Sequence, residues 1–156
     1  VLFRSGLTPL GARGLLAARV LVSMMIIAVQ TAILVVLTGV LSGWWPGDPA
    51  QIAQAGAGIL LAVWALTAWA LLIAGTLRAE ATLALANAVF LVLMFGGGLA
   101  IPADSLPWSS MAGLLPTGAL VAAMSDPVLA WMPLGVLVVW AVVGSVLAGR
   151  FFRWEG

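Results

Sequence analysis

The sequence contains no cysteine and no histidine, and its six basic residues are all arginine. It therefore offers no disulfide, no thiolate nucleophile, no imidazole base and few ways of binding zinc or haem. Charged residues make up only 7% of the 156 residues, and a net charge of +1 provides no basic surface for nucleic acid. These absences argue against an enzyme and against a nucleic-acid partner. They also predict no cofactor or metal bound by this chain.

What the sequence has in excess is apolar residues. They account for 64% of the chain, whereas a soluble domain has roughly 45 to 50% apolar and 25% charged residues. We therefore predict an all-α integral membrane protein embedded in the lipid bilayer. Its arginine-only basic residues, together with abundant alanine and glycine, suggest a bacterial source and hence a plasma (inner) membrane location.

Four stretches are predicted to span the membrane within a single transmembrane domain, residues 1–156. Residues 20–41 carry no charge and, at 1.5 Å per residue, form a helix of about 33 Å, enough for one span. The next spans are predicted over residues 55–77, 83–101 and 128–148. Glycine, proline and tryptophan mark a loop at the membrane interface between the first two spans.

The apolar stretch 95–127 is too interrupted to cross a bilayer as one helix. Three consecutive glycines and Pro102 predict that the third span ends near Ile101. Short helices are then expected over residues 108–115 and 117–125, each about 12 to 14 Å long, too short for a span of about 20 residues. We therefore predict an external re-entrant helical hairpin over 106–125, covered by protein. The residues expected to shape it are Gly96, Gly97, Gly98, Pro102, Pro107 and Pro116.

Side-chain caps are expected at the start of both short helices. Asp104 and Ser105 provide oxygens for the first helix, and Thr117 provides a hydroxyl for the second. The hairpin lies across the external exit of the bundle in this prediction. It could act as a moving outer gate or as a static cap, and the sequence leaves both interpretations open.

The arginines predict the orientation. With four spans, all of them fall on one side of the membrane: Arg4, Arg13, Arg19, Arg78, Arg150 and Arg153. Three aspartates fall on the other side: Asp48, Asp104 and Asp126. The positive-inside rule makes the arginine side cytoplasmic. Both ends of the chain are then expected in the cytoplasm, with the hairpin outside.

Polar and aromatic side chains within the spans are the candidates for a transport pathway. Gln30 and Asn87 are amides in the first and third spans, and Trp69 lies deep in the second. The alternative is structural, because amides form hydrogen bonds between membrane helices and tryptophan packs between helices or against lipid.

Four segments together resemble the membrane subunit of an ATP-binding cassette exporter of the ABC-2 type. They are TPLGARGLLAAR (8–19), FGGGLAIPADSLP (95–107), LLPTGAL (114–120) and GRFFRWE (149–155). That family has six membrane helices, and the match covers the third to the sixth. Because the chain also begins at Val1 rather than Met, the resemblance implies an N-terminally truncated permease.

The resemblance implies a permease without a nucleotide site, working with a separate ATP-binding subunit and a second permease half. The chain has no GxxxxGK[ST] loop and no lysine to complete one. The cytoplasmic segment 6–19 would be the coupling element that docks on the ATPase. Its candidate contact residues are Leu7, Thr8, Pro9, Leu10 and Arg13. Cargo in the family includes drugs, lipids and polysaccharides.

Two other classes of function compete with an exporter. A membrane-embedded enzyme would need an intramembrane nucleophile or metal ligands, but the carboxylates lie at the membrane boundaries and Ser23 has no His or Lys partner. A non-transporting scaffold, an accessory subunit or a non-functional fragment stays open. A neighbouring gene for an ATP-binding subunit would favour the exporter.

Overall fold

The computed structural model describes residues 11–43, 45–125 and 131–151, and in these residues it is helical without strands. The long helices are α1 (Gly11–Ser42), α2 (Pro49–Thr76), α3 (Ala79–Gly96) and α6 (Trp131–Phe151). Each of the four is long and apolar enough to cross a membrane. The predicted class, an all-α membrane protein with four spanning helices, is confirmed.

The first two helices begin earlier than predicted. α1 is continuous from Gly11, so residues 11–19 form its first turns rather than a segment that precedes the first helix. Gly14 is tolerated there because a single glycine weakens a helix by only about 1 kcal/mol. α2 begins at Pro49, where the Asp48 carboxylate accepts a hydrogen bond from the Ala50 backbone N–H at 2.9 Å. Part of the predicted loop is therefore helix.

The prediction that the third span ends near Ile101 is wrong. α3 stops at Gly96, the first of the three glycines. Gly97 leaves the helical region as its C-cap, and Gly98 has a φ of +83°, which residues with a side chain rarely adopt. The glycines therefore end the helix directly, five residues before the position where Pro102 would begin to forbid it.

Only the second half of the predicted hairpin is a substantial helix. The first half is a 3₁₀ turn, η2 (Ala103–Ser105), and a single helical turn, α4 (Ser109–Ala112). Neither Asp104 nor Ser105 caps α4, because both residues belong to η2 and the Ser105 hydroxyl donates to the Pro102 carbonyl at 2.7 Å. α5 (Pro116–Ser125) follows, and the start of the predicted fourth span at residue 128 lies outside the described residues.

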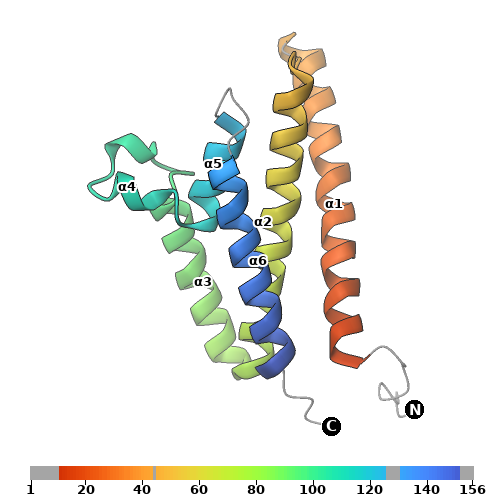
Figure 1. Cartoon of the computed structure of the whole chain (residues 1–156), viewed down its shortest axis with the longest axis vertical. Helices are drawn as coiled ribbons and strands as arrows, with labels where there is room; N and C mark the ends of the chain where they lie inside the picture. The colour runs from red at the N-terminus through yellow and green to blue at the C-terminus, as the bar shows by residue number, and fades with distance from the viewer. Residues whose placement is uncertain (1–10, 44, 126–130, 152–156) are drawn as a thin grey trace.

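α2 and α6 form the centre of the bundle (Figure 1). Their buried positions recur every three or four residues and are mostly small, which lets two apolar helices approach closely in a membrane. These residues are Gln54, Gly58, Ala62, Ala65 and Ala68 on α2, and Leu137, Ala141, Gly144 and Ala148 on α6.

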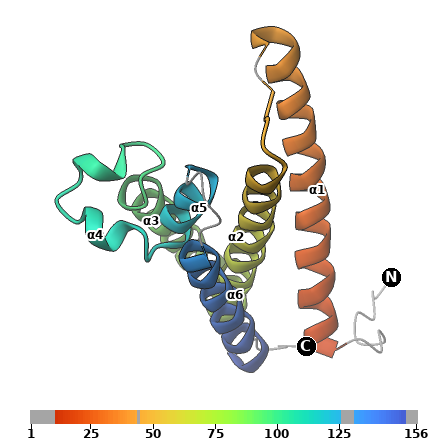
Figure 2. The ribbon, with the colours of Figure 1, turned by 45° about the horizontal axis from the view of Figure 1, so that its top comes forward.

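Figure 2 shows α1 on one side of this pair and α3, α4 and α5 on the other. α1 packs mainly on α2, with a smaller contact to α6, and α3 has no buried residue. Such apolar outer surfaces are suited to contact with lipid or with another membrane helix.

The described arginines and aspartates lie at opposite ends of the bundle. The start of α1, the turn between α2 and α3 and the end of α6 lie at the same end of the bundle (Figure 1). Arg13, Arg19, Arg78 and Arg150 belong to that end. Asp48 and Asp104 belong to the opposite one. Arg4, Asp126 and Arg153 lie outside the described residues. The segregation used to predict orientation is therefore present in the fold.

Candidate functional site

α5 is a short helix enclosed by three long ones. It packs against α2, α6 and α3, at the end of the bundle opposite the arginines. Most of its first turn and a later alanine are buried: Pro116, Thr117, Gly118, Ala119 and Ala123. α4, by contrast, lies outside the bundle in Figure 2 and packs mainly against η2. The two halves of the predicted hairpin therefore have different environments.

The start of α5 is joined to the end of α3. The Thr117 hydroxyl donates a hydrogen bond at 2.8 Å to the Leu93 carbonyl, which also accepts the backbone N–H of Gly97 in the last turn of α3. Thr117 was expected to cap α5 itself, so this prediction is wrong. A Cβ on Gly97 would clash with the Thr117 hydroxyl and lie 2.8 Å from the Gly118 backbone nitrogen. Glycine is required here because two backbones come into contact.

A second close approach joins α4 to α5. A Cβ on Gly118 would clash with the Ala112 carbonyl oxygen and lie 2.7 Å from the Ala112 carbonyl carbon. In the connecting segment, the Leu114 carbonyl accepts a hydrogen bond from the Trp140 indole N–H of α6 at 2.8 Å. The break in the helix around Pro116 is therefore held by protein, as required for irregular backbone at membrane depth.

Gln54 of α2 holds the other end of α5. Its side chain is only 2% exposed, and its amide N–H donates to the Ala123 carbonyl at 2.9 Å. Gln54 was expected in the loop before the second span, so this role was not predicted. The α5 helix is thus connected through hydrogen bonds to α3 at its first turn and to α2 at its last.

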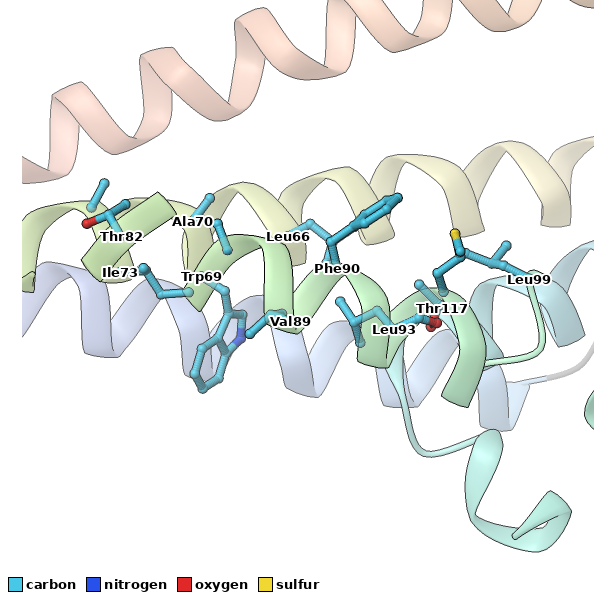
Figure 3. Close-up of a pocket in the computed structure, with 13 residues that line it drawn as sticks. Leu66, Trp69, Ala70, Ile73, Thr82, Val89, Phe90, Leu93, Leu99 and Thr117 are labelled. Atoms are coloured by element: carbon cyan, nitrogen blue, oxygen red, sulfur yellow. The ribbon is translucent and has the colours of Figure 1, made fainter. Parts of the chain in front are cut away.

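An apolar groove separates α2 from α3 (Figure 3). Its volume is about 510 Å³, and α5 closes it at one end through Thr117. Because α5 is wedged between α3 and the α2–α6 pair, α2 and α3 meet closely only near their shared turn. The lining residues are Leu66, Trp69, Ala70, Ile73, Ala74, Thr82, Ala86, Val89, Phe90, Leu93, Met94, Leu99 and Thr117.

Trp69 forms part of the wall of this groove and is fixed in orientation. Its indole N–H donates to the Trp140 carbonyl at 3.1 Å, and the two indole rings lie 5.3 Å apart at 60°. A Cβ on Gly144 of α6 would lie 2.7 Å from the Trp69 ring, so this glycine makes room for the indole. Trp69 is therefore both a packing residue and a lining residue.

The described residues offer this site little reactive chemistry. No buried side-chain nitrogen or oxygen among them lacks a hydrogen-bond partner. Within the same residues, no cluster of three or more histidine, cysteine, aspartate or glutamate side chains could hold a metal ion. The groove is suited to binding an apolar molecule.

The chain was compared with protein-family models, with curated proteins and with solved structures. None of the three comparisons gives a match. What the chain does must therefore be argued from its residues and their geometry.

The three candidate pathway residues are not brought together. Gln30 and Asn87 are exposed on the surfaces of α1 and α3, on opposite sides of the α2–α6 pair, whereas Trp69 lines the groove. In the described part of the chain neither amide hydrogen-bonds another helix, so the structural role suggested for them is not seen. Of the candidate coupling residues, Arg13 lies in the first turn of α1. The others lie outside the described residues: Leu7, Thr8, Pro9 and Leu10.

Of the predicted hairpin residues, four take part in the α3–α5 junction. Gly96, Gly97 and Gly98 end α3 and Pro116 begins α5, whereas Pro102 and Pro107 are exposed in the segment between them. Sequence reasoning missed Gln54, Trp140 and Ser145. Ser145 accepts a hydrogen bond from the Trp64 indole N–H at 2.9 Å. A buried polar residue on an alanine-rich helix face was the signal available for Gln54.

Proposed function

We propose that the chain is the permease half of an ATP-driven exporter of the ABC-2 type, working with a separate ATP-binding subunit and a second permease half. The observation that supports this best is the short helix α5 packed between spanning helices at the end opposite the arginines. The described parts of the four segments that resemble the family, residues 11–19, 95–107, 114–120 and 149–151, lie at the start of α1, the α3–α5 junction and the end of α6.

The proposed orientation places the arginine-bearing end in the cytoplasm of a bacterial cell. Arg19, Arg78 and Arg150 are exposed at that end, where the positive-inside rule expects them. The start of α1 would then face the ATP-binding subunit, and α5 would lie at the external side of the plasma (inner) membrane. Cargo would leave the cell at the α5 end.

Within this proposal α5 is a static external cap rather than a moving gate. Gln54 and Thr117 hold its two ends through hydrogen bonds, and most of its first turn is buried. Moving α5 alone would expose the Ala123 carbonyl and the Gln54 amide, at about 1 to 3 kcal/mol for each unsatisfied group. α4 lies outside the bundle, and its buried Ala112 packs against Gly118 at the start of α5.

The experiment that tests the proposal is co-purification with an ATP-binding subunit encoded beside this gene. The full-length chain is expected to bind it, and replacing Leu10 and Arg13 together is expected to weaken the complex. The matched control is replacement of Leu41 and Asp48 at the opposite end, which should leave the complex intact. An inserted chain that never retains the subunit would favour a non-transporting scaffold instead.

A further inference from the structure

The groove between α2 and α3 ends beside an arginine. Arg78 is the N-cap residue of α3, and its carbonyl accepts a hydrogen bond from the Thr82 backbone N–H at 2.8 Å. Thr82 is the groove-lining residue nearest to that end of α3. Arg78 is exposed, so its guanidinium is available to a ligand that enters the groove from the arginine side.

The helical register separates Arg78 from its acidic neighbour. The lining residues Thr82, Ala86, Val89 and Leu93 recur every three or four residues, with Phe90 beside Val89, so they form one stripe along α3. The neighbouring acidic residue on α3 lies only two positions before Thr82, and residues two apart on a helix do not face the same side. The groove therefore ends beside the positive charge of Arg78 rather than beside a neutral pair of opposite charges.

The polar side chains that line the groove have no free hydrogen-bond donor to offer a ligand. The Thr82 hydroxyl donates to the Leu77 carbonyl, the Thr117 hydroxyl donates to the Leu93 carbonyl, and the Trp69 indole N–H donates to Trp140. A hydrogen-bond acceptor placed inside would lose its hydrogen bonds with water and gain none from these side chains, at a cost of about 1 to 3 kcal/mol. The part of a ligand that enters must be apolar.

The groove is too small to enclose a whole helix. From Thr82 to Leu93 the stripe is about 17 Å long, and a helix of that length and 10 Å diameter occupies roughly 1,300 Å³. The groove holds about 510 Å³. It is open on the outer side, because α3 has no buried residue and Phe90 is 60% exposed. A flexible hydrocarbon chain from the surrounding bilayer fits inside such a volume, whereas a further membrane helix would lie over its open side.

We propose that this groove binds one acyl chain of an anionic phospholipid, with the lipid phosphate beside Arg78. The lipid comes from the leaflet at the arginine-bearing end, and it fills the space that α5 creates by holding α2 and α3 apart. It is a resident lipid that completes the packing between these helices. The inference goes beyond the proposed function and does not depend on it.

The test is native mass spectrometry of the full-length chain released from bilayers of equimolar phosphatidylglycerol and phosphatidylcholine. The unmodified chain is expected to retain one phosphatidylglycerol in preference to phosphatidylcholine. Arg78→Gln should reduce that preference about fivefold, the effect expected for one arginine near a membrane surface. The matched control Glu80→Gln removes a negative charge, so it should keep or raise the preference for phosphatidylglycerol.

A second pair of variants tests the acyl-chain position. Ala86 lines the groove, so Ala86→Phe should fill it and reduce retained phosphatidylglycerol at least as much as Arg78→Gln. Ala84 is exposed and does not line the groove, so Ala84→Phe should leave lipid binding unchanged. Equal loss in both phenylalanine variants, or no preference between the two lipids, would overturn the proposal.

A third variant separates a lipid from a second copy of the chain. Ala86→Cys introduces a single cysteine into a chain that has none. It is expected to stay monomeric under oxidation in the bilayer, because lipid covers the groove. Rapid formation of a disulfide-linked dimer would mean that another copy occupies this face, and the lipid assignment would then be wrong. Lipid retention is independent of any ATP-binding subunit, so failure here and failure of the exporter proposal are distinguishable.

Discussion

Replacing Gly97 with alanine tests whether the α3–α5 junction depends on direct backbone contact. An added Cβ would clash with the Thr117 hydroxyl and lie 2.8 Å from the Gly118 nitrogen, whereas unbonded heavy atoms prefer about 3.5 to 4.0 Å. The hydroxyl could rotate away, but the backbone nitrogen cannot. The two helices must therefore separate, and the hydrogen bond from Thr117 to Leu93 must lengthen from 2.8 Å.

The expected cost follows from these contacts. Overpacking costs about 1 to 3 kcal/mol, and a hydrogen bond between membrane helices contributes about 0.6 kcal/mol on average. Restricting the unfolded chain offsets about 0.4 to 1 kcal/mol of this, because alanine has less conformational freedom than glycine. We expect Gly97→Ala to lower the free energy of unfolding by about 1 to 3 kcal/mol, measured by circular dichroism in mixed detergent micelles.

Gly113 provides the matched control in the same segment. It has a φ of −65°, which alanine adopts readily, and a Cβ there would meet nothing within 4 Å. Gly113→Ala should therefore leave stability unchanged or raise it by up to about 1 kcal/mol. If both variants change the free energy of unfolding by the same amount and in the same direction, the backbone contact at Gly97 does not exist as described.

Three further predictions address the rest of the bundle. Gln54→Leu should lower the free energy of unfolding by about 1 to 3 kcal/mol, because the Ala123 carbonyl loses its donor in a buried site. An unchanged free energy of unfolding would mean that Gln54 does not stabilise the position of α5. Cysteine at Asp48 should react with a membrane-impermeant maleimide in intact cells and cysteine at Glu80 should not; the opposite pattern would reverse the orientation. A disulfide between cysteines introduced at Gly58 and Ala123, whose Cβ positions lie 3.0 Å apart, should leave ATP-driven export intact. If the disulfide blocks export and its reduction restores export, α5 is a moving gate.

The spanning helices were predictable because length and hydropathy decide whether a segment can cross a bilayer. The ends of those helices were harder to predict. The sequence gives no rule for choosing among consecutive glycines, and α3 stops at the first of them since Gly97 packs against the backbone at Gly118. That packing is a contact between distant segments, which local helix propensity does not describe.

The candidate site was predicted only in part. The break before Pro116 follows from proline chemistry, and the structure places α5 where a short helix was expected. The hydrogen bonds of Gln54 and Trp140 to backbone carbonyls were not predictable, because they depend on which helix faces pack against each other through their small residues. The groove has the same origin: it exists because α5 separates α2 and α3, and no motif in either helix marks it.

The central claim is that this chain couples to an ATP-binding subunit, and the rate of ATP hydrolysis measures this directly. The adjacent ATP-binding subunit would be assayed in lipid vesicles with the full-length chain, without it, and with the chain carrying replacements at Leu10 and Arg13. We predict that the unmodified chain changes the hydrolysis rate and that the replaced chain does not. An identical rate in all three preparations, with the chain correctly inserted and the subunit present, would contradict the proposed function.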